Sequence, residues 1–585
     1  MNVKEFIKWT KSTVPPSLNL VILLMSGLFF CLILLSDKAS AGVYTSTLHG
    51  TSADRSVVDS TFPYTTLGLC AHCHEQHASI DGAEPTPPTA EGASTYELFR
   101  SNFGTTDKNE LCFACHETFN LSGMPLGYGR YGIYQGKTKY NDSVHYSSAN
   151  MDWSPDPSPP GPPFSVTSSF TDPGNCHNCH NPHGTDDGSG SPIQQMLFAK
   201  DSMTGDSPAY ELGGCEACHD GTQGGASKDV QAELAKVESG GYGHPTHTYN
   251  DRHTLPESGD SSFGPANRHA ECVDCHNPHT VVSGTIHTPG TTGNAVSDVL
   301  KYVWGVQPTS WPSNWTSVSN FTERKPPTYS DGAQYEYQIC FKCHSDYGLG
   351  TVTNAMSTIG SGSTLETDQA WEFNPNNKSF HPVVSALGTG TGSTNQLEAE
   401  QMTGGWSPGD TMYCSDCHNT DNSTGAQGPH GSTVKWMLAG TNKAWPYTSA
   451  ALNGTSGTTN FRTFSSRDTN IGTDDGLFCA NCHTLDASGH IHTIEEGNHQ
   501  GPCVGCHIRV PHGGKVSRLI AAGDQANPVD SLPARYAPDG NGGGTVYLRR
   551  FTKASTYADY GIGNCYATNA ACSEHNHSGS GTESW

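Results

Sequence analysis

Apolar residues gather in one run near the start of the chain and are thinly spread after it. The run covers residues 20–35, and nothing later is apolar enough to span a membrane. Hydrophobic residues make up 34% of the 585, glycine alone contributes 66, and serine and threonine are dense throughout. This pattern predicts mostly irregular backbone with short helices and few strands, because an ordinary apolar core needs more hydrophobic residues.

The amino-terminal run has the composition of an export signal. It is preceded by three lysines, Lys4, Lys8 and Lys11. A basic segment, an apolar segment and an Ala-x-Ala site predict a signal peptide over residues 1–41, cut after Ala41. The run is shorter than the ~20 residues that a spanning helix needs, although an uncleaved anchor remains an alternative. Cys31 lies in the run behind the bulky Phe30, which disfavours lipid attachment.

The dominant pattern after residue 41 is Cys-x-x-Cys-His, which occurs nine times. A zinc ribbon, a redox disulfide or a structural bridge explains paired cysteines, but none of these requires histidine as the next residue. Because histidine is 29 of the 585 residues, one chance match has odds of about 5%. Two such cysteines can each form a thioether to one vinyl group of a haem, and the following histidine then ligates the iron. The repeat therefore predicts nine covalently attached haems c.

These motifs account for 18 of the 21 cysteines. The attachment cysteines are Cys70 and Cys73, Cys112 and Cys115, Cys176 and Cys179, Cys215 and Cys218, Cys272 and Cys275, Cys340 and Cys343, Cys414 and Cys417, Cys479 and Cys482, and Cys503 and Cys506. The predicted proximal iron ligands are His74, His116, His180, His219, His276, His344, His418, His483 and His507.

A haem iron with one histidine either takes a second axial ligand or stays open to substrate. The repeat unit offers a lone histidine, an odd-numbered motif with a follower histidine after it, and an even-numbered motif without a follower. Methionine shows no matching period, so we expect histidine on both sides of every iron. The expected second ligands are His49, His77, His145, His183, His247 (or His244), His279, His381, His430 and His492 (or His490), with His512 as the last follower. The expected non-ligands are His72, His177, His253, His269, His287 and His499.

Order along the chain suggests a pairing. We assign each lone histidine to the odd motif after it and each follower to the next even motif; proline before a follower stiffens its approach to the iron. This order leaves His512 without a haem of its own chain, while His49 lies near the start of the mature chain. We therefore expect His49 or His512 to bind a haem of a neighbouring copy, and such a contact that does not close builds an open filament. The alternative is a monomer in which both act within their own chain.

The sequence divides into three regions. After the signal, a nonahaem region covers residues 42–520, with repeat units that begin near residues 42, 145, 244, 381 and 490. Residues 521–585 form a haem-free extension that contains Cys565 and Cys572. A local disulfide, a degenerate haem site and free thiols are the alternatives for this pair, and an oxidising compartment favours the disulfide.

The alternation of Cys-x-x-Cys-His-x-Pro-His with a plain Cys-x-x-Cys-His resembles the paired-motif multihaem cytochromes of metal-reducing bacteria. The resemblance covers residues 42–512 and rests on the nine motifs with His183, His279, His430 and His512. It is closest to outer-surface and extracellular members, some of which polymerise into conductive filaments. It implies bis-histidine haems in a close-packed chain, little regular secondary structure and electron transport to extracellular acceptors.

Charge agrees with an exported electron carrier. Lys and Arg number 31 against 56 Asp and Glu, a formal charge of −25. This balance disfavours nucleic acid and anionic membrane surfaces and suits metal ions, minerals or cationic partners, although solubility alone also explains it. We expect a secreted or outer-surface electron-transfer protein, not an enzyme, with donor cytochromes, extracellular metal or mineral acceptors and copies of itself as partners. The alternatives are a nitrite- or hydroxylamine-type reductase with one open haem and a periplasmic electron-transfer subunit.

Overall fold

The computed structural model describes part of the chain. The described residues are 109, 112–113, 140–147, 176, 179–180, 215–216, 218–221, 228–246, 270–282, 284–326, 332–349, 368–387, 402–443, 478–484, 510–514 and 519, with the backbone of 546–548, 551–553, 560–562 and 565–567. The chain divides into two compact units: the first comprises Met1–Cys115, Ser122–Met124 and Asp152–Gly205, and the second comprises His116–Leu121, Pro125–Met151 and Asp206–Trp585. The expected signal peptide and motifs one and nine lie outside the described residues.

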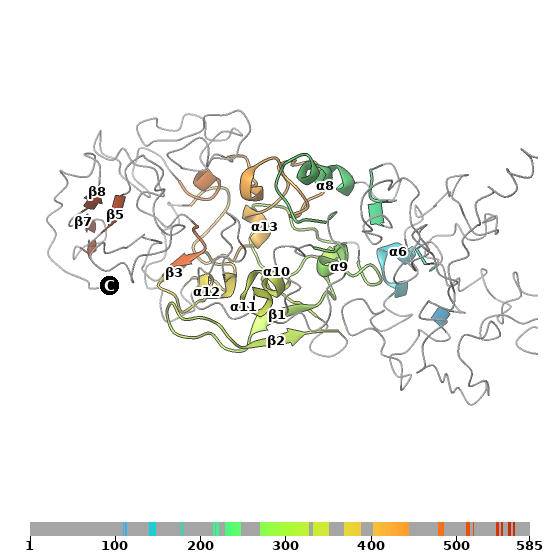
Figure 1. Ribbon diagram of the computed structural model, residues 1–585, viewed down its shortest axis with the longest axis horizontal. Coiled ribbons are helices and arrows are strands. Elements are labelled where there is room, and N and C mark those ends of the chain that lie inside the picture. The colour runs from blue at the N-terminus through green and yellow to red at the C-terminus, as the bar shows by residue number, and fades with distance from the viewer. Residues whose placement is uncertain are drawn as a thin grey trace, which may run out of the picture. The chain divides into compact units, whose positions relative to one another are not determined.

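The described helices are short, with four to nine residues. They are α6 (Val144–Ser147), α8 (Val230–Glu238), α9 (Cys272–Cys275), α10 (Glu336–His344), α11 (Asp346–Leu349), α12 (Gln369–Glu372) and α13 (Cys414–Cys417), with 3₁₀ turns η8 (Asp298–Leu300), η10 (Lys435–Met437) and η11 (Phe478–Asn481). The strands form antiparallel pairs: β1 (Gly305–Pro308) with β2 (Phe321–Arg324), and β3 (Ser379–Phe380) with β4 (Gly513–Gly514). Figure 1 shows β1 and β2 beside α10 and α11.

Two more strand pairs lie in the carboxy-terminal part of the chain. β5 (Val546–Leu548) pairs with β8 (Cys565–Ala567), and β6 (Phe551–Lys553) pairs with β7 (Tyr560–Ile562). Both pairs fall within the expected haem-free extension, and Cys565 is the first residue of β8. Cys572 and the side chain of Cys565 lie outside the described residues, so the expected disulfide stays a prediction.

Among the described residues, the Cys-x-x-Cys-His motifs form helical turns, and that of motif six is the last turn of α10. In five of them the histidine amide donates to the carbonyl of the first cysteine at 2.9–3.0 Å: His180, His219, His276, His418 and His483. In α9 and α13 an aspartate within the motif accepts a 2.7 Å hydrogen bond from the amide of the residue before the first cysteine. This reciprocal capping holds a four-residue turn that is too short to be stable by propensity alone.

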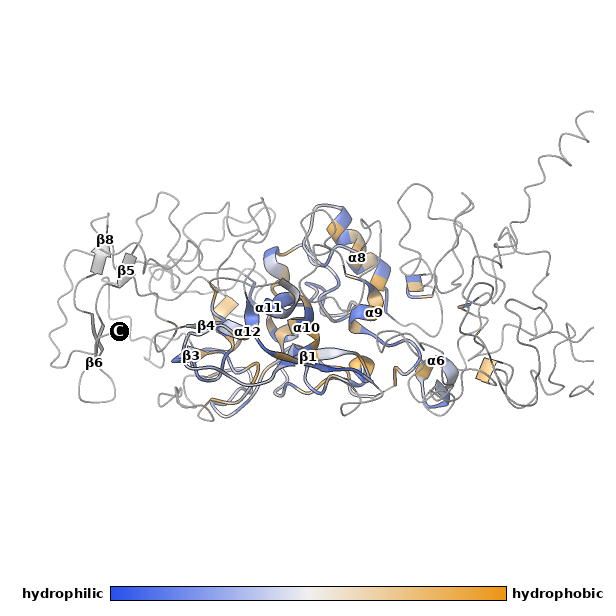
Figure 2. Cartoon of the chain, turned by 60° about the horizontal axis from the view of Figure 1, so that its bottom comes forward, coloured by the Kyte–Doolittle hydropathy of each residue, from blue (hydrophilic) through white to orange (hydrophobic). Residues whose placement is uncertain are grey.

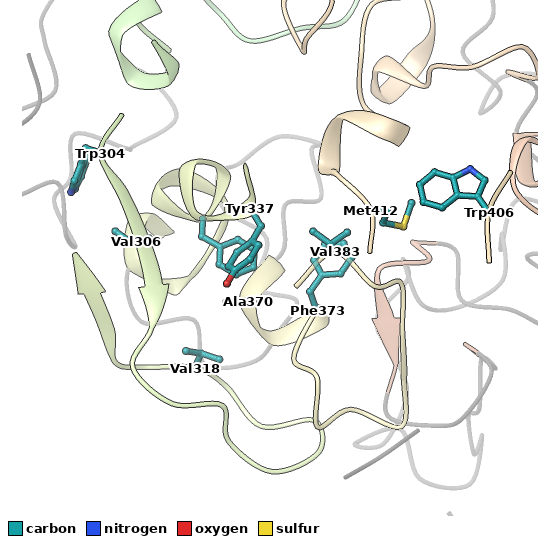
Figure 3. Packing of buried hydrophobic residues seen from close by; sticks show 10 residues of the cluster. Trp304, Val306, Val318, Tyr337, Ala370, Phe373, Val383, Trp406 and Met412 are labelled. Atoms are coloured by element: carbon teal, nitrogen blue, oxygen red, sulfur yellow. The ribbon is translucent and has the colours of Figure 1, made fainter. Parts of the chain in front are cut away.

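The apolar core of the second unit borders the motif cysteines. Figure 3 shows Tyr337 and Phe373 packed together with Val383, and Met412 beside Trp406. Partly buried cysteines of motifs seven and eight pack against this cluster: Cys414, Cys417 and Cys482. The apolar side chains are therefore concentrated around the attachment turns.

The helices are two-sided rather than apolar throughout. Figure 2 shows hydrophilic and hydrophobic residues side by side on α8, whose Leu234 is buried. Asp229 begins this helix, and its carboxylate accepts the Ala232 amide at 2.7 Å, as an N-cap does. No helix within the described ranges is long and apolar enough to cross a bilayer.

Candidate functional site

Five motif histidines each stand opposite a second histidine from a distant segment. The distances between ring centroids fall in a narrow interval: 6.3 Å for His145–His219, 6.0 Å for His244–His344, 6.2 Å for His276–His430, 6.2 Å for His381–His483 and 6.1 Å for His418–His512. One member of each pair directly follows a Cys-x-x-Cys turn, and the other belongs to no motif. All five pairs lie in the second unit.

This spacing fits two imidazoles that bind one metal ion from opposite sides. A metal–nitrogen bond is about 2.0–2.1 Å, and the ring centre lies about 1 Å behind the nitrogen, so two opposed rings have centroids about 6 Å apart. Direct stacking would bring the rings closer, as His287 and Tyr413 do at 3.7 Å. The residues present therefore fit a haem iron held between two histidines, with the neighbouring cysteines available for thioethers.

Five of these paired histidines have a lowered pKa, which keeps their rings in the neutral form that metal ligation requires. Burial, together with the charge of nearby histidines, lowers the pKa of His219, His418 and His430 to about 4. Burial also lowers the pKa of His145 and His244 below its usual value. These imidazoles are neutral at pH 7, and a neutral imidazole is the form that binds a metal.

Backbone carbonyls orient the three described lone histidines. The Nδ1 atom of His145 is 2.7 Å from the Pro278 carbonyl, and that of His244 is 2.9 Å from the Pro429 carbonyl. His381 makes the same contact with the Pro511 carbonyl. Each of these prolines directly precedes a follower histidine. An acceptor at Nδ1 fixes the proton there and leaves Nε2 for the iron.

Short backbone bridges place the two kinds of second ligand side by side. Tyr242 and Ser432 exchange amide–carbonyl hydrogen bonds of 2.8 Å, which places the backbone of His244 beside the backbone of His430. The β3–β4 pairing of Phe380 with Gly513 continues to the next residues, His381 and His512, whose backbones are joined by a hydrogen bond of 2.9 Å. Each bridge therefore carries one ligand for an even motif and one for an odd motif.

The glycine after two follower histidines is required by this close approach. A Cβ atom at Gly431 would collide with the Glu233 carbonyl, and one at Gly513 would collide with the Glu372 carbonyl. The sequence Pro-His-Gly therefore combines a carbonyl acceptor, a ligand and a residue small enough to pass a neighbouring helix.

Motifs four to eight are neighbours in order. His276 of motif five lies close enough to His219 of motif four to lower its pKa. The Cys340 thiol of motif six lies within hydrogen-bond distance of Cys414 of motif seven and raises the pKa of the Cys414 thiol. The bridges described above join motifs five and six and motifs seven and eight. In the first unit, the Cys112 thiol of motif two makes the same kind of contact with Cys176 of motif three.

The pairing differs from the one expected from order along the chain. The lone histidines His145, His244 and His381 stand opposite the even motifs of their own repeat units, four, six and eight, and not the odd motifs. The follower His430 stands opposite motif five rather than motif eight. The bridges cause the shift, because each pairs a lone histidine with the follower of the next unit.

Two further expectations change. His512 stands opposite His418 of its own chain, so it is not the spare follower that reaches a neighbouring copy. His279 was expected at motif six, but His344 already has His244 opposite it. His287, an expected non-ligand, stacks on Tyr413 and lies 3.1 Å from an Asp416 oxygen.

Several predicted ligands lie outside the described residues: His49, His74, His77, His116, His183, His247, His490, His492 and His507. The same holds for the attachment cysteines Cys70, Cys73, Cys115, Cys503 and Cys506.

Reasoning from sequence missed the acceptors of the ring nitrogens, namely the three proline carbonyls and the Glu372 carboxylate. The recurring proline before a follower histidine was the available signal, and it points to a carbonyl acceptor as well as to a stiff approach. Within the described ranges, no group of three or more His, Cys, Asp or Glu side chains forms a candidate site for a bare metal ion. Comparison with protein-family models, with curated proteins and with solved structures found no match.

Proposed function

We propose that this protein is a nonahaem c-type cytochrome that carries electrons along a row of bis-histidine haems to extracellular acceptors. The observation that carries the proposal is the set of five opposed histidine pairs, each of which combines a Cys-x-x-Cys-His histidine with a distant one. Nothing in the apolar composition demands this spacing, whereas axial ligation of iron does.

The chain has three tasks in this function. Paired cysteines attach each haem, two neutral histidines hold its iron, and carbonyl or carboxylate acceptors orient those histidines. Haem c, when bound, supplies one-electron chemistry at a potential set by its ligands and surroundings. The side-by-side order of motifs four to eight supports transport along a row, because each motif lies near the next.

A reductase is the second candidate, and it needs an open axial position with acid or base groups nearby. In the five described pairs, a second histidine stands opposite the motif histidine. This favours electron transfer over substrate binding at those positions, and we assign no catalytic residue.

Haem content and spin state test the proposal. Mass spectrometry of the purified mature protein should give nine haems per chain, and EPR of the oxidised protein should contain only low-spin ferric signals. Slow or absent cyanide binding should accompany them. A chain without haem would reject the cytochrome, and a sizeable high-spin signal with rapid nitrite or cyanide binding would favour the reductase.

The extracellular location rests on the export signal and the acidic balance. We propose a secreted or outer-surface protein that receives electrons from donor cytochromes and passes them to metal ions or minerals. Protease treatment of intact cells tests this: an accessible protein supports the outer surface, and a protected one supports the periplasmic alternative.

Assembly into a filament is a further part of the proposal, and the register of ligands names a bridging residue. In the described pairs a follower stands opposite the odd motif of the preceding unit, as His430 and His512 do. By the same register, His77 would serve an odd motif ahead of its own unit, and motif nine would take a follower from a unit beyond it. We therefore propose that His77 of one copy binds the haem of motif nine in the next, a head-to-tail contact that repeats without closing.

Electron microscopy of cell-surface material tests the filament. The wild type should give filaments, and His77→Ala should give dispersed particles that still carry nine haems. His253→Ala, an exchange at an expected non-ligand, is the matched control and should leave filaments intact. Dispersed particles in the wild type, or filaments in the His77→Ala strain, would reject this contact.

A further inference from the structure

The ring of His512 has a carboxylate as acceptor, whereas six other paired histidines have backbone carbonyls. Its Nδ1 atom lies 2.7 Å from Oε2 of Glu372. The Glu372 side chain is fully buried, with 0% of its surface exposed. The ring stands opposite His418, so Nε2 would be the atom that holds the iron, and Nδ1 would then carry the proton and donate a hydrogen bond to the carboxylate.

Other paired histidines contact backbone carbonyls through Nδ1. Six histidines share this arrangement: His145, His244, His276, His381, His418 and His430. A carboxylate is a stronger acceptor than a carbonyl, because its charge strengthens the hydrogen bond roughly twofold. Among these seven rings, that of His512 is therefore the one drawn furthest toward an imidazolate.

The position of Glu372 is built by its surroundings. It is the last residue of α12, which Asp368 begins by accepting the amides of Ala370 and Trp371 at 3.0 and 3.2 Å. The Asn377 amide donates to the Glu372 carbonyl at 2.9 Å. Phe373 lies against the His512 ring with centroids 4.8 Å apart. The carboxylate is thus held against one ligand ring by packing and by backbone contacts.

We propose that Glu372 lowers the reduction potential of the haem site at motif seven below that of the neighbouring sites, by raising the donor strength of His512. This inference rests on the proposed cytochrome function. An acceptor on the distal nitrogen makes an imidazole more basic, and a more basic ligand stabilises ferric over ferrous iron. The partner ligand acts in the same direction, because the Nδ1 atom of His418 lies only 2.6 Å from the Trp436 carbonyl.

The consequence is one haem site of low reduction potential in the middle of the row. Motif seven touches motif six through Cys340 and Cys414, and it shares the β3–β4 bridge with motif eight. In a partly reduced protein the site at motif seven would be the last to fill with an electron. Glu372 is a positioning residue here, since it acts through His512.

Redox titration of the full holoprotein, followed by absorbance in an optically transparent cell, tests the role. Glu372→Gln keeps an oxygen acceptor but removes the charge, and we expect the lowest midpoint potential to rise by ~59 mV, a tenfold change in the one-electron equilibrium constant. The matched control is Glu336→Gln, because Glu336 is a buried carboxylate that accepts from Ser415 of motif seven and touches no ligand ring. In Glu336→Gln the lowest midpoint potential should change by less than a third of the shift expected for Glu372→Gln.

Equal shifts in the two variants, or none in Glu372→Gln, would overturn the proposal. The wild type offers a test that needs no variant: near-infrared magnetic circular dichroism should contain one charge-transfer band at higher energy, from the imidazolate-like ligand. Coincident bands from all sites would also overturn it. Haem content separates the two levels of inference, since nine haems with an unmoved potential reject only the role of Glu372.

Discussion

The backbone of His381 lies beside that of His512, and the His381 amide donates to the His512 carbonyl at 2.9 Å. The rings of these two neighbours nevertheless stand against different motif histidines, His483 and His418. One backbone contact therefore positions the histidines that stand opposite two consecutive motifs. The bridge between Tyr242 and Ser432 does the same for the two preceding sites, so pairs of sites are the natural structural unit of this part of the chain.

His244→Ala should open one iron in nine. Because His244 stands opposite His344, its loss leaves motif six with a single histidine, and we expect a high-spin ferric EPR signal of about one ninth of the haem content. His247→Ala is the matched control, three residues away, and should keep all irons low-spin. A high-spin signal in His247→Ala alone would assign the ligand to His247 instead.

Gly513→Ala should weaken the β3–β4 bridge. A Cβ atom there meets the backbone carbonyl of Glu372, which cannot move aside as a flexible side chain could. We expect a loss of about 1–3 kcal/mol in the free energy of unfolding, measured by denaturant titration. Gly409→Ala is the control, because nothing lies within 4 Å of its added Cβ atom, and it should change stability by less than about 0.5 kcal/mol. Equal losses in the two variants would contradict the close-approach argument.

The sequence predicts one histidine of each pair, but it did not predict which distant histidine stands opposite it. Cys-x-x-Cys-His names one histidine per site by local chemistry, since the turn that holds both cysteines also holds the histidine. The second ligand comes from a distant segment, such as His145, which bonds to the carbonyl of Pro278 at a separation of 133 residues. A count of histidines stays the same when each is assigned to another site, so counting cannot detect a shifted register.

The acceptors of the ring nitrogens were also beyond sequence reasoning. They are mostly backbone carbonyls, which every residue carries, so residue type does not mark them. Glu372 looked like any other acidic residue of an acidic chain, and only the β3–β4 ladder brings it against His512. The short helices and strands of the described residues agree with the low apolar content, because the cores available to them are small.

Stability should fall as pH rises through the range set by Asp368. Burial raises the pKa of this carboxyl to about 7, against about 4 in the unfolded chain. Between those values the folded protein keeps a proton that the unfolded chain releases, so the contribution of this group to stability is full below pH 4 and falls by about 1.4 kcal/mol per pH unit up to pH 7.

Asp368→Asn removes this dependence while keeping a good helix cap, because asparagine caps as well as aspartate. The difference between wild type and variant, followed by denaturant unfolding at pH 4 to 8, should grow in favour of the variant and level off above pH 7. The slope between pH 4 and 7 is the decisive quantity. A difference that stays constant over this range would mean that Asp368 ionises as an exposed carboxyl does.

His287 should be structural, unlike the ten paired histidines. Its ring is buried, stacks on Tyr413 at 3.7 Å and shares a hydrogen bond of 3.0 Å with Thr291. We expect His287→Ala to lower the free energy of unfolding by about 2 kcal/mol, because it leaves a cavity and removes a ring contact. EPR should still contain only low-spin signals, and the haem count should remain nine. A new high-spin signal in this variant would make His287 a ligand and would break the rule that each paired histidine faces a motif histidine at about 6 Å.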